Sequence, residues 1–320
     1  MLIIYILVGL LAGFAIANMT PINAGLREKV GSPLIAIVIS ILISTLVMLI
    51  ATLITGQNLW PDMAFVTSHS PIIWIGGVIG AIYVTSNILM FPKIGAIETV
   101  VLPLLGQILT GLLIDVFGLL NLPKVPLHAE KIIGVLLLIV GLWITIVLAE
   151  KKRLQSLGTA KGSERWLWRI WGIIVGGATA FQQTINGALG GALAQNSNMI
   201  KGTIQGSFFA FFVGLIAILI ITAIKEKRVL PTAAQWKTLK ATDFLGGLFN
   251  GVVGMVRMGL RIVLSQTIVV ALVDFGQIAT GLLVQQFGWW KSPKNPVNKL
   301  QIIGLVIMFV GVLMIVGVFA

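Results

Sequence analysis

Long apolar stretches alternate with short polar ones along the whole chain. A helix rises 1.5 Å per residue and the hydrocarbon core of a bilayer is about 30 Å thick, so about 20 mostly apolar residues can span it. Ten segments meet this length and predict ten transmembrane helices. They are residues 2–22, 33–55, 71–91, 95–117, 131–149, 167–187, 203–224, 243–260, 263–285 and 300–319.

Composition agrees with this pattern and narrows the classes of function. Hydrophobic residues make up 58% of the chain and charged residues 10%, whereas a soluble domain has about a quarter charged residues. The net charge of +12 comes from Lys and Arg that lie almost entirely between apolar segments, so nucleic acid is not expected as a partner. Without cysteine, and with His69 and His128 isolated, the sequence predicts no metal site and no cofactor. The expected partners are the lipid bilayer and a small-molecule solute.

The chain also contains an internal repeat. Residues 106–113 read Gly-Gln-Ile-Leu-Thr-Gly-Leu-Leu, and residues 276–283, 170 positions later, read Gly-Gln-Ile-Ala-Thr-Gly-Leu-Leu. Near the start of each copy, Ile22-Asn23 corresponds to Ile185-Asn186 at a spacing of 163. The repeat redefines the unit of the fold, because each copy then holds five of the ten predicted helices.

Five is an odd number of spans, so a second copy joined by one short linker enters the membrane in the opposite orientation. The predicted fold is an all-α membrane protein of two inverted-topology five-helix repeats, residues 1–150 and 167–320, with a cytoplasmic linker at 151–166. Inverted repeats are typical of secondary transporters, which alternate between two states around a site near the middle of the bilayer.

The positions of Lys and Arg predict the orientation independently, because basic residues in short loops stay on the cytoplasmic side. With the N-terminus outside, 17 basic residues lie on the cytoplasmic side and 5 lie elsewhere. We therefore expect both termini outside, in the inner membrane of a bacterium. The first helix starts Met1-Leu2-Ile3-Ile4, without the positive residues of a cleavable signal, and is expected to remain as an anchor.

Three runs of residues resemble a known family. Residues 20–26 (Thr-Pro-Ile-Asn-Ala-Gly-Leu), 31–34 (Gly-Ser-Pro-Leu) and 182–190 (Gln-Gln-Thr-Ile-Asn-Gly-Ala-Leu-Gly) are similar to the opening signature of YdcZ-type proteins of the drug/metabolite transporter superfamily. With the Gly-Gln-x-x-Thr-Gly-Leu-Leu runs, the resemblance extends over nearly the whole chain. It implies a ten-helix, EamA-like transporter fold made from a fused pair of five-helix copies.

The chain departs from one device of that superfamily. Its small multidrug exporters rely on a Glu inside the first helix, and Tyr5 to Leu26 contains no acidic residue. Proton-coupled export of cations by that device is therefore not expected.

The repeated motif supplies the first candidate site residues. Gln107 and Gln277 lie near the middle of the fourth and ninth predicted helices, and each is followed three residues later by a threonine, Thr110 or Thr280. Symmetric amides at the midplane suit a solute site, and adjacent glycines admit close approach. The alternative is that these side chains only hydrogen-bond across helices and hold them together.

Two charged residues in predicted spans form a second candidate. Asp274 lies three residues before Gln277, on the same helical face, and Arg257 lies in the eighth predicted helix at a similar depth. A bound pair would be structural, whereas a separable pair would let Asp274 take a proton while Arg257 holds an anionic group of the substrate. The first repeat has Leu104 and Asn87 at these positions.

Four further polar residues lie near predicted helix ends. Glu98 is expected to complement the positive end of its helix beside Lys93, and Asp115, at the other end, is expected to be exposed to water. Asn23 and Asn186 lie at the end of the first helix of each copy, where they either brace two gates or cap the helices.

Together these features favour a secondary transporter, in the exporting direction, of small metabolites or drug-like solutes. No Gly-x4-Gly-Lys-Ser/Thr phosphate loop is present, so no ATP-driven step is expected and the coupling ion is open. No His-Glu-x-x-His motif or paired intramembrane aspartates are present, which argues against an enzyme. A channel or a non-transporting membrane scaffold is the alternative, and both monomer and homodimer are compatible with the pattern.

Overall fold

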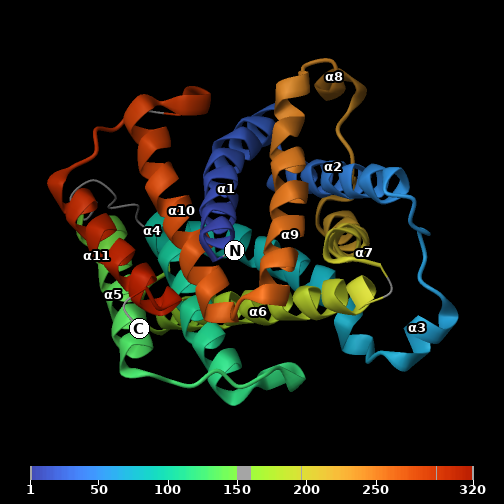
Figure 1. The fold of residues 1–320 in the computed structure, drawn as a ribbon. Coiled ribbons are helices and arrows are strands. Elements are labelled where there is room, and N and C mark those ends of the chain that lie inside the picture. Colours follow the sequence, from blue (N-terminus) through green and yellow to red (C-terminus); the bar gives the residue numbers. More distant parts are fainter. Residues whose placement is uncertain (1, 150–159, 196, 293, 319–320) are drawn as a thin grey trace. The chain divides into compact units, whose positions relative to one another are not determined.

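The computed structural model describes residues 2–149, 160–195, 197–292 and 294–318 (Figure 1). Within these ranges every regular element is helical, as predicted. The long helices are α1 (Leu2–Val30), α2 (Pro33–Ile54), α4 (Gly76–Phe117), α5 (Ala129–Leu142), α6 (Gly162–Gln195), α7 (Met199–Glu226), α9 (Leu245–Val263), α10 (Gln266–Phe287) and α11 (Lys299–Val316). The short ones are α3 (Met63–Ser68), α8 (Ala233–Trp236), η1 (Pro71–Trp74), η2 (Leu119–Asn121), η3 (Trp143–Leu148), η4 (Ala241–Phe244) and η5 (Trp289–Lys291). Most of the predicted linker, 151–159, lies outside the described residues.

Eight described helical segments are long and apolar enough to cross a membrane. These are α1, α2, Gly76–Gly95 and Glu98–Phe117 of α4, Ala129–Leu148, α7, α10 and α11. The other two predicted spans, 167–187 and 243–260, lie on α6 and α9, where glycine, glutamine and arginine dilute the apolar residues. Gly-rich surfaces are typical of helices that pack closely within a membrane protein. The count of ten spans stays a prediction.

Local residues explain where the long helices bend or continue. Within α4 the backbone leaves the helical region at Gly95 (φ 83°, ψ 173°), which separates the third and fourth predicted spans. α1 and α6 do not end at 22 and 187 as predicted, but continue to Val30 and Gln195. In α1 the helix runs through Pro21, which a membrane helix tolerates when neighbouring groups satisfy the freed carbonyl.

The contacts divide the chain into two compact units. Unit 1 comprises Met1–Phe14, Ile82–Phe181 and Leu264–Ala320, and unit 2 comprises Ala15–Ala81 and Gln182–Val263. Helices α1, α4 and α6 contribute to both units. Each unit therefore draws residues from both predicted repeats.

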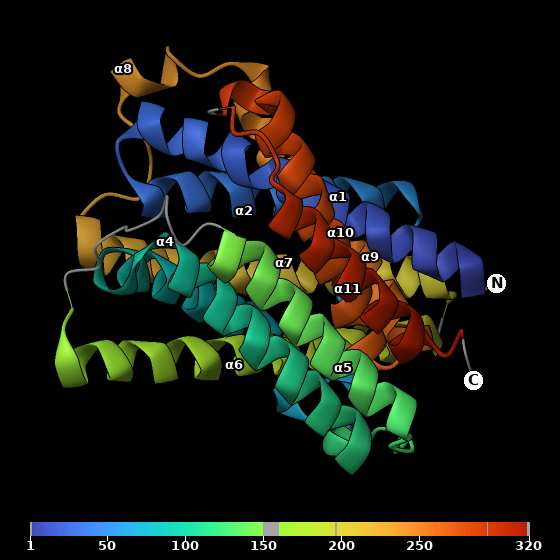
Figure 2. The same cartoon turned by 90° about the vertical axis from the view of Figure 1, so that its left-hand side faces the viewer.

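In unit 1, α11 packs along α5 and against α10, and α5 and α11 lie side by side in Figures 1 and 2. A β-carbon added to Gly134 would lie 2.8 Å from the carbonyl oxygen of Gly311, and one added to Gly141 would lie 2.6 Å from that of Gly304. The absence of side chains at these four positions lets the two backbones touch. Leu138, which is 1% exposed, fills the apolar core beside this crossing.

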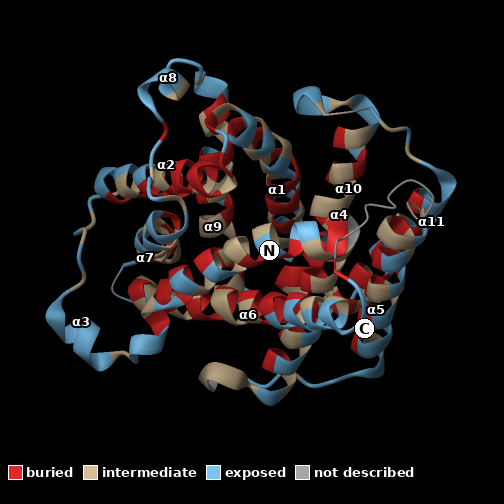
Figure 3. Cartoon of the chain, turned by 180° about the vertical axis from the view of Figure 1, so that it is seen from behind, coloured by how far each residue is buried: buried red, intermediate tan, exposed pale blue. Residues whose placement is uncertain are grey.

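Unit 2 is built around α2, which packs against α7 and α9. The Ser44 hydroxyl donates to the Gly247 carbonyl oxygen (2.8 Å) and accepts from the side-chain amide of Asn250 (3.0 Å), joining α2 to α9. On α7, Phe209 is buried and its ring packs against Trp60, with ring centroids 5.5 Å apart. Figure 3 marks such buried residues in red.

Structural elements recur with the spacing of the sequence repeat. α3 and α8 begin at 63 and 233, η1 and η4 at 71 and 241, and α5 and α11 at 129 and 299, each 170 apart. The helix ends match as well, since Gly118 and Gly288 both adopt the left-handed conformation, with φ of 63° and 67°. After these turns the Val125 amide donates to the Asp115 carbonyl oxygen, and the Asn295 amide to that of Gln285, both at 2.8 Å. The repeat is thus present in local structure as well as in sequence.

Candidate functional site

The eight candidate site residues are distributed over both units. Five lie in unit 1: Gln107, Thr110, Asp274, Gln277 and Thr280. Three lie in unit 2: Asn23, Asn186 and Arg257. The pairing of Arg257 with Asp274, and a common solute site for all eight, therefore stay predictions.

The candidate residues of unit 1 lie on helices that neighbouring helices approach closely at glycine positions. A β-carbon on Gly176 of α6 would meet the carbonyl group of Pro103 of α4, 2.6 Å from its carbon. About two turns further along α4, Thr110 packs on Gly177, where an added β-carbon would lie 2.6 Å from the threonine hydroxyl. Gln107 lies between these two contacts and is 4% exposed. Close packing thus fixes this amide inside unit 1.

The second copy of the Gly-Gln-x-x-Thr motif, on α10, is also packed closely against a glycine of another helix. A β-carbon on Gly13 of α1 would lie 2.5 Å from the backbone nitrogen of Gln277 and 2.7 Å from the carbonyl carbon of Gly276. On the same helix Asp274 is 1% and Thr280 6% exposed. α10 is the most buried of the eight candidate spans, with 67% of its apolar window buried. Asp274 and Thr280 therefore face protein rather than lipid.

Asn23 and Asn186 do not cap helices, which corrects one of the two predicted roles. Both lie inside helices, because α1 and α6 are longer than expected. Asn23 packs on Gly246 of α9 and Asn186 packs on Gly76 of α4. Each side-chain oxygen occupies the space that a β-carbon would fill, and each makes no conventional hydrogen bond with the described residues. Such an oxygen over a glycine suits a Cα–H···O contact between helices.

Asp115 is buried, so the expectation that it is exposed to water is wrong. Its side chain is 2% exposed, and its two oxygens accept hydrogen bonds at 2.8 Å from the backbone amides of Gln266 and Thr267. These donors are at the start of α10, where a helix has unpaired amides and partial positive charge. The Lys131 ammonium lies 3.4 Å from the same carboxylate. Asp115 thus joins α4, α5 and α10 within unit 1.

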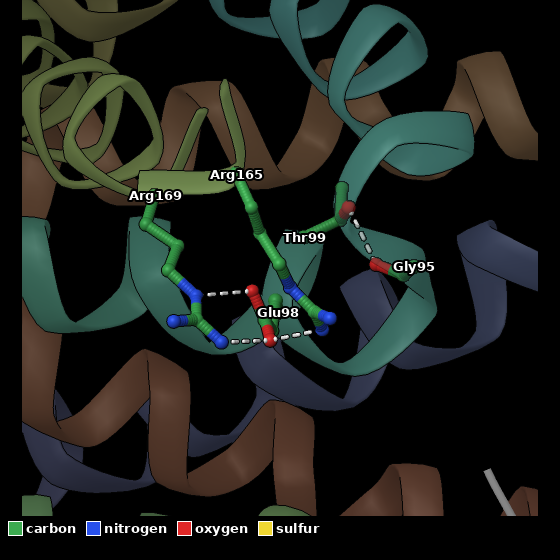
Figure 4. Close-up of polar contacts among 5 residues, drawn as sticks. All are labelled: Gly95, Glu98, Thr99, Arg165 and Arg169. Atoms are coloured by element: carbon green, nitrogen blue, oxygen red, sulfur yellow. Dashed lines mark hydrogen bonds and ion pairs between the residues drawn. The ribbon is translucent and has the colours of Figure 1, made fainter. Parts of the chain in front are cut away.

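Glu98 also has partners other than the expected one. Arg169 donates to its two oxygens from Nε (2.8 Å) and Nη2 (2.7 Å), and Arg165 donates from Nη2 at 2.7 Å (Figure 4). The planar fork of an arginine suits this two-point contact with a carboxylate. Beside it, the Thr99 hydroxyl donates to the Gly95 carbonyl oxygen at 2.7 Å, at the break in α4 (Figure 4).

Lys93, the expected neighbour of Glu98, instead pairs with Glu164 at 2.9 Å. The hydrogen bond and the positive charge of this ammonium hold the pKa of the Glu164 carboxyl below its usual value. Glu98 and Lys93, which were expected beside each other, are therefore each paired with α6 instead: Glu98 with two arginines and Lys93 with Glu164.

The repeat carries a signal for the Asp115–Lys131 pair that sequence reasoning missed. At a spacing of 170, Asp115 corresponds to Gln285 and Lys131 to Gln301. The second copy therefore lacks both charges, as expected for two residues that form an ion pair. Arg165 and Arg169 carried no such signal, because charges beside a span also report topology.

Comparison with known proteins finds a family of membrane proteins that matches both copies of the repeat. The family described as "Putative inner membrane exporter, YdcZ" matches twice, over residues 4–144 and 167–314. No curated protein matches the sequence. Nineteen chains of solved structures match. One, described as "Crystal structure of protein", has 14% sequence identity and a TM-score of 0.64, with 96% of this chain and 95% of that chain covered. At this identity the likeness shows a shared fold alone.

Proposed function

Because the chain belongs to the YdcZ family, we propose that it is a secondary transporter that exports small metabolites or drug-like solutes across the inner membrane by alternating access. In this proposal it has ten spans in two inverted repeats, 1–150 and 167–320. Both termini are outside and the 151–166 linker is cytoplasmic. It catalyses no reaction and hydrolyses no ATP.

Reciprocal contacts between the two copies are the observation that carries the proposal. Gly134 of the first copy touches Gly311 of the second. Their equivalents at a spacing of 170, Gly304 of the second copy and Gly141 of the first, touch as well. An exchange of this kind is what a two-fold axis between two copies produces. The α5–α11 crossing therefore supports an inverted repeat.

The asparagines repeat the exchange in unit 2. Asn23 of the first copy packs on Gly246 of the second, and Asn186 of the second packs on Gly76 of the first. The spacings are 163 for the asparagines and 170 for the glycines, as in the sequence repeat. Inverted repeats that exchange contacts in this way support rocking between two mirror-related states. Each asparagine then braces one of the two gates.

The proposed solute site uses the residues near the midplane. Gln107 and Gln277 bind polar groups of the solute, with Thr110 and Thr280 beside them. Arg257 and Asp274 add charge to the second copy only, where Asp274 carries the coupling proton if one is used. A buried ionisable group in a membrane span is costly and is commonly kept for such a role.

Solute flux tests this proposal. In proteoliposomes screened with labelled metabolites, we expect uptake above that of empty vesicles for at least one solute. Gln107→Leu and Gln277→Leu are each expected to lower this flux about tenfold, since a lost hydrogen bond to a buried group costs about 1–2 kcal/mol. Leu113→Ala is the matched control on the same helix, because Leu113 is 48% exposed.

Two results would count against transport. A panel in which every solute stays at the level of empty vesicles would contradict it, and single-channel conductance in planar bilayers would favour a channel. Equal loss of flux in Leu113→Ala and Gln107→Leu would show that Gln107 is not part of the solute site.

The absence of cysteine allows a direct test of orientation. We expect an impermeant maleimide to label Ser197→Cys in intact spheroplasts, and to label Lys237→Cys only after permeabilisation. Both residues are exposed, so accessibility does not differ for structural reasons. The reverse pattern would overturn the predicted orientation and leave the fold untouched.

A further inference from the structure

Unit 2 contains a pocket that none of the candidate site residues line. It lies where the segment between α2 and α3 meets the turn between α6 and α7, and its volume is about 420 Å³. Volumes from about 300 to 1,000 Å³ are usual for pockets that bind small molecules. The pocket is therefore large enough for a metabolite-sized ligand.

Hydrogen bonds and ring contacts hold the walls of this pocket in place. The Gln57 side chain donates to the backbone carbonyl of Lys201 (3.1 Å), and the Gln205 side chain donates to that of Asn58 (2.8 Å). Trp60 packs on rings of α7 while remaining 59% exposed. The walls are therefore organised without a ligand, which reduces the entropy lost on binding.

One carboxylate and one ammonium line the pocket. Asp62 precedes α3 but makes no side-chain bond to its first turn. Lys201 lies in the first turn of α7. Within the described parts of the chain, neither takes part in an ion pair. Both charges are thus available to a ligand, and the rings of Trp60 and Phe65 line the same pocket.

The repeat shows that these charges are not part of the common scaffold. At a spacing of 170, Leu59-Trp60-Pro61-Asp62 corresponds to Val229-Leu230-Pro231-Thr232, and Lys201 corresponds to Gly31. The equivalent positions, 229–232 in the second copy and Gly31 in the first, keep the proline but lack both charges and the tryptophan. The pocket is therefore a specialised feature of one side of the molecule.

We propose that this pocket binds a small zwitterion. The ligand's ammonium group faces Asp62 and the ring of Trp60, which attracts a cation by its quadrupole. The ligand's carboxylate faces Lys201, and the apolar part of the ligand packs on Phe65. This binding site shares no residue with the proposed transport site, so it stands or falls independently of transport.

A matched series of probes tests the charges one at a time. L-phenylalanine carries both groups, phenethylamine only the ammonium, and 3-phenylpropionate only the carboxylate. By isothermal titration calorimetry on the purified protein in detergent, we expect L-phenylalanine to bind about tenfold more tightly than either other probe, as loss of one charged contact of about 1.4 kcal/mol gives. Equal affinities for all three probes, or no binding by L-phenylalanine, would overturn the proposal.

Two substitutions assign each charge to its partner. Asp62→Asn is expected to weaken L-phenylalanine and phenethylamine about tenfold and leave 3-phenylpropionate unchanged, whereas Lys201→Gln weakens L-phenylalanine and 3-phenylpropionate and spares phenethylamine. Glu28→Gln and Lys237→Gln are controls at exposed positions outside the pocket. Losses no larger than in these controls would contradict the assignment. Thermal unfolding of each variant shows whether it is folded. If the protein binds the zwitterion but transports no solute in proteoliposomes, the proposed transport function is refuted and the binding site is not.

Discussion

Replacing Asp115 by alanine is expected to lower the free energy of unfolding by about 3–5 kcal/mol, as the loss of one partner of a buried ion pair does. The substitution removes the acceptor of two amides at the start of α10 and leaves the ammonium of Lys131, which is 9% exposed, without its carboxylate. Thermal unfolding of the purified protein in detergent measures the effect as a lower midpoint.

Lys131→Met separates the two causes. In this variant Asp115 keeps both backbone donors and the positive end of α10, so we expect a smaller loss, of about 1–2 kcal/mol. Glu164→Ala is the control for removal of a carboxylate, because its pair with Lys93 is exposed and its midpoint should change little. If Asp115→Ala unfolds at the same temperature as Glu164→Ala, the three-helix junction does not stabilise unit 1.

The surroundings of Asp115 show why this junction was not predictable from hydropathy. Counted along the chain, the residue lies near the end of an apolar segment, where a carboxylate usually meets water. Its backbone donors are 151 and 152 residues away, and the helix that carries them must first fold beside α4. Burial therefore depends on tertiary packing, which a pattern along one segment does not contain. Comparison between the two copies does contain it, since Gln285 and Gln301 replace both charges.

Other parts of the fold were predictable because they depend on neighbouring residues. Apolar length identifies the helices, and Gly95 marks the break in α4. The ends of α1 and α6 were missed: both helices continue past Asn23 or Asn186, and each asparagine there contacts a glycine of another helix. The family was identified from short motifs, whereas the side-chain partners of Glu98 required the structure.

Charges fix both ends of the helix that carries Gln107. At its start Glu98 binds two arginines of α6, and at its end Asp115 binds Lys131 and the first turn of α10. The equivalent positions at the two ends of α10, Ile268 and Gln285, carry no charge. The two Gly-Gln-x-x-Thr helices are therefore related in sequence but held differently. This asymmetry adds to that of Asp274, which has no counterpart in the first copy.

Gly176→Ala is expected to destabilise the protein by about 3 kcal/mol, the upper part of the range for added bulk in a packed interior. The added methyl group would lie 2.6 Å from the carbonyl carbon and from the α-carbon of Pro103, and backbone cannot turn aside as a flexible side chain can. Gly281→Ala is the matched control, because no atom outside the neighbouring backbone of its own helix lies within 4 Å of its added carbon. Relief of glycine's helix penalty should make that variant more stable by about 0.5–1 kcal/mol. The two unfolding midpoints are thus expected to move in opposite directions, and a shift of the same sign in both would show that α6 does not contact α4 as closely as Gly176 indicates.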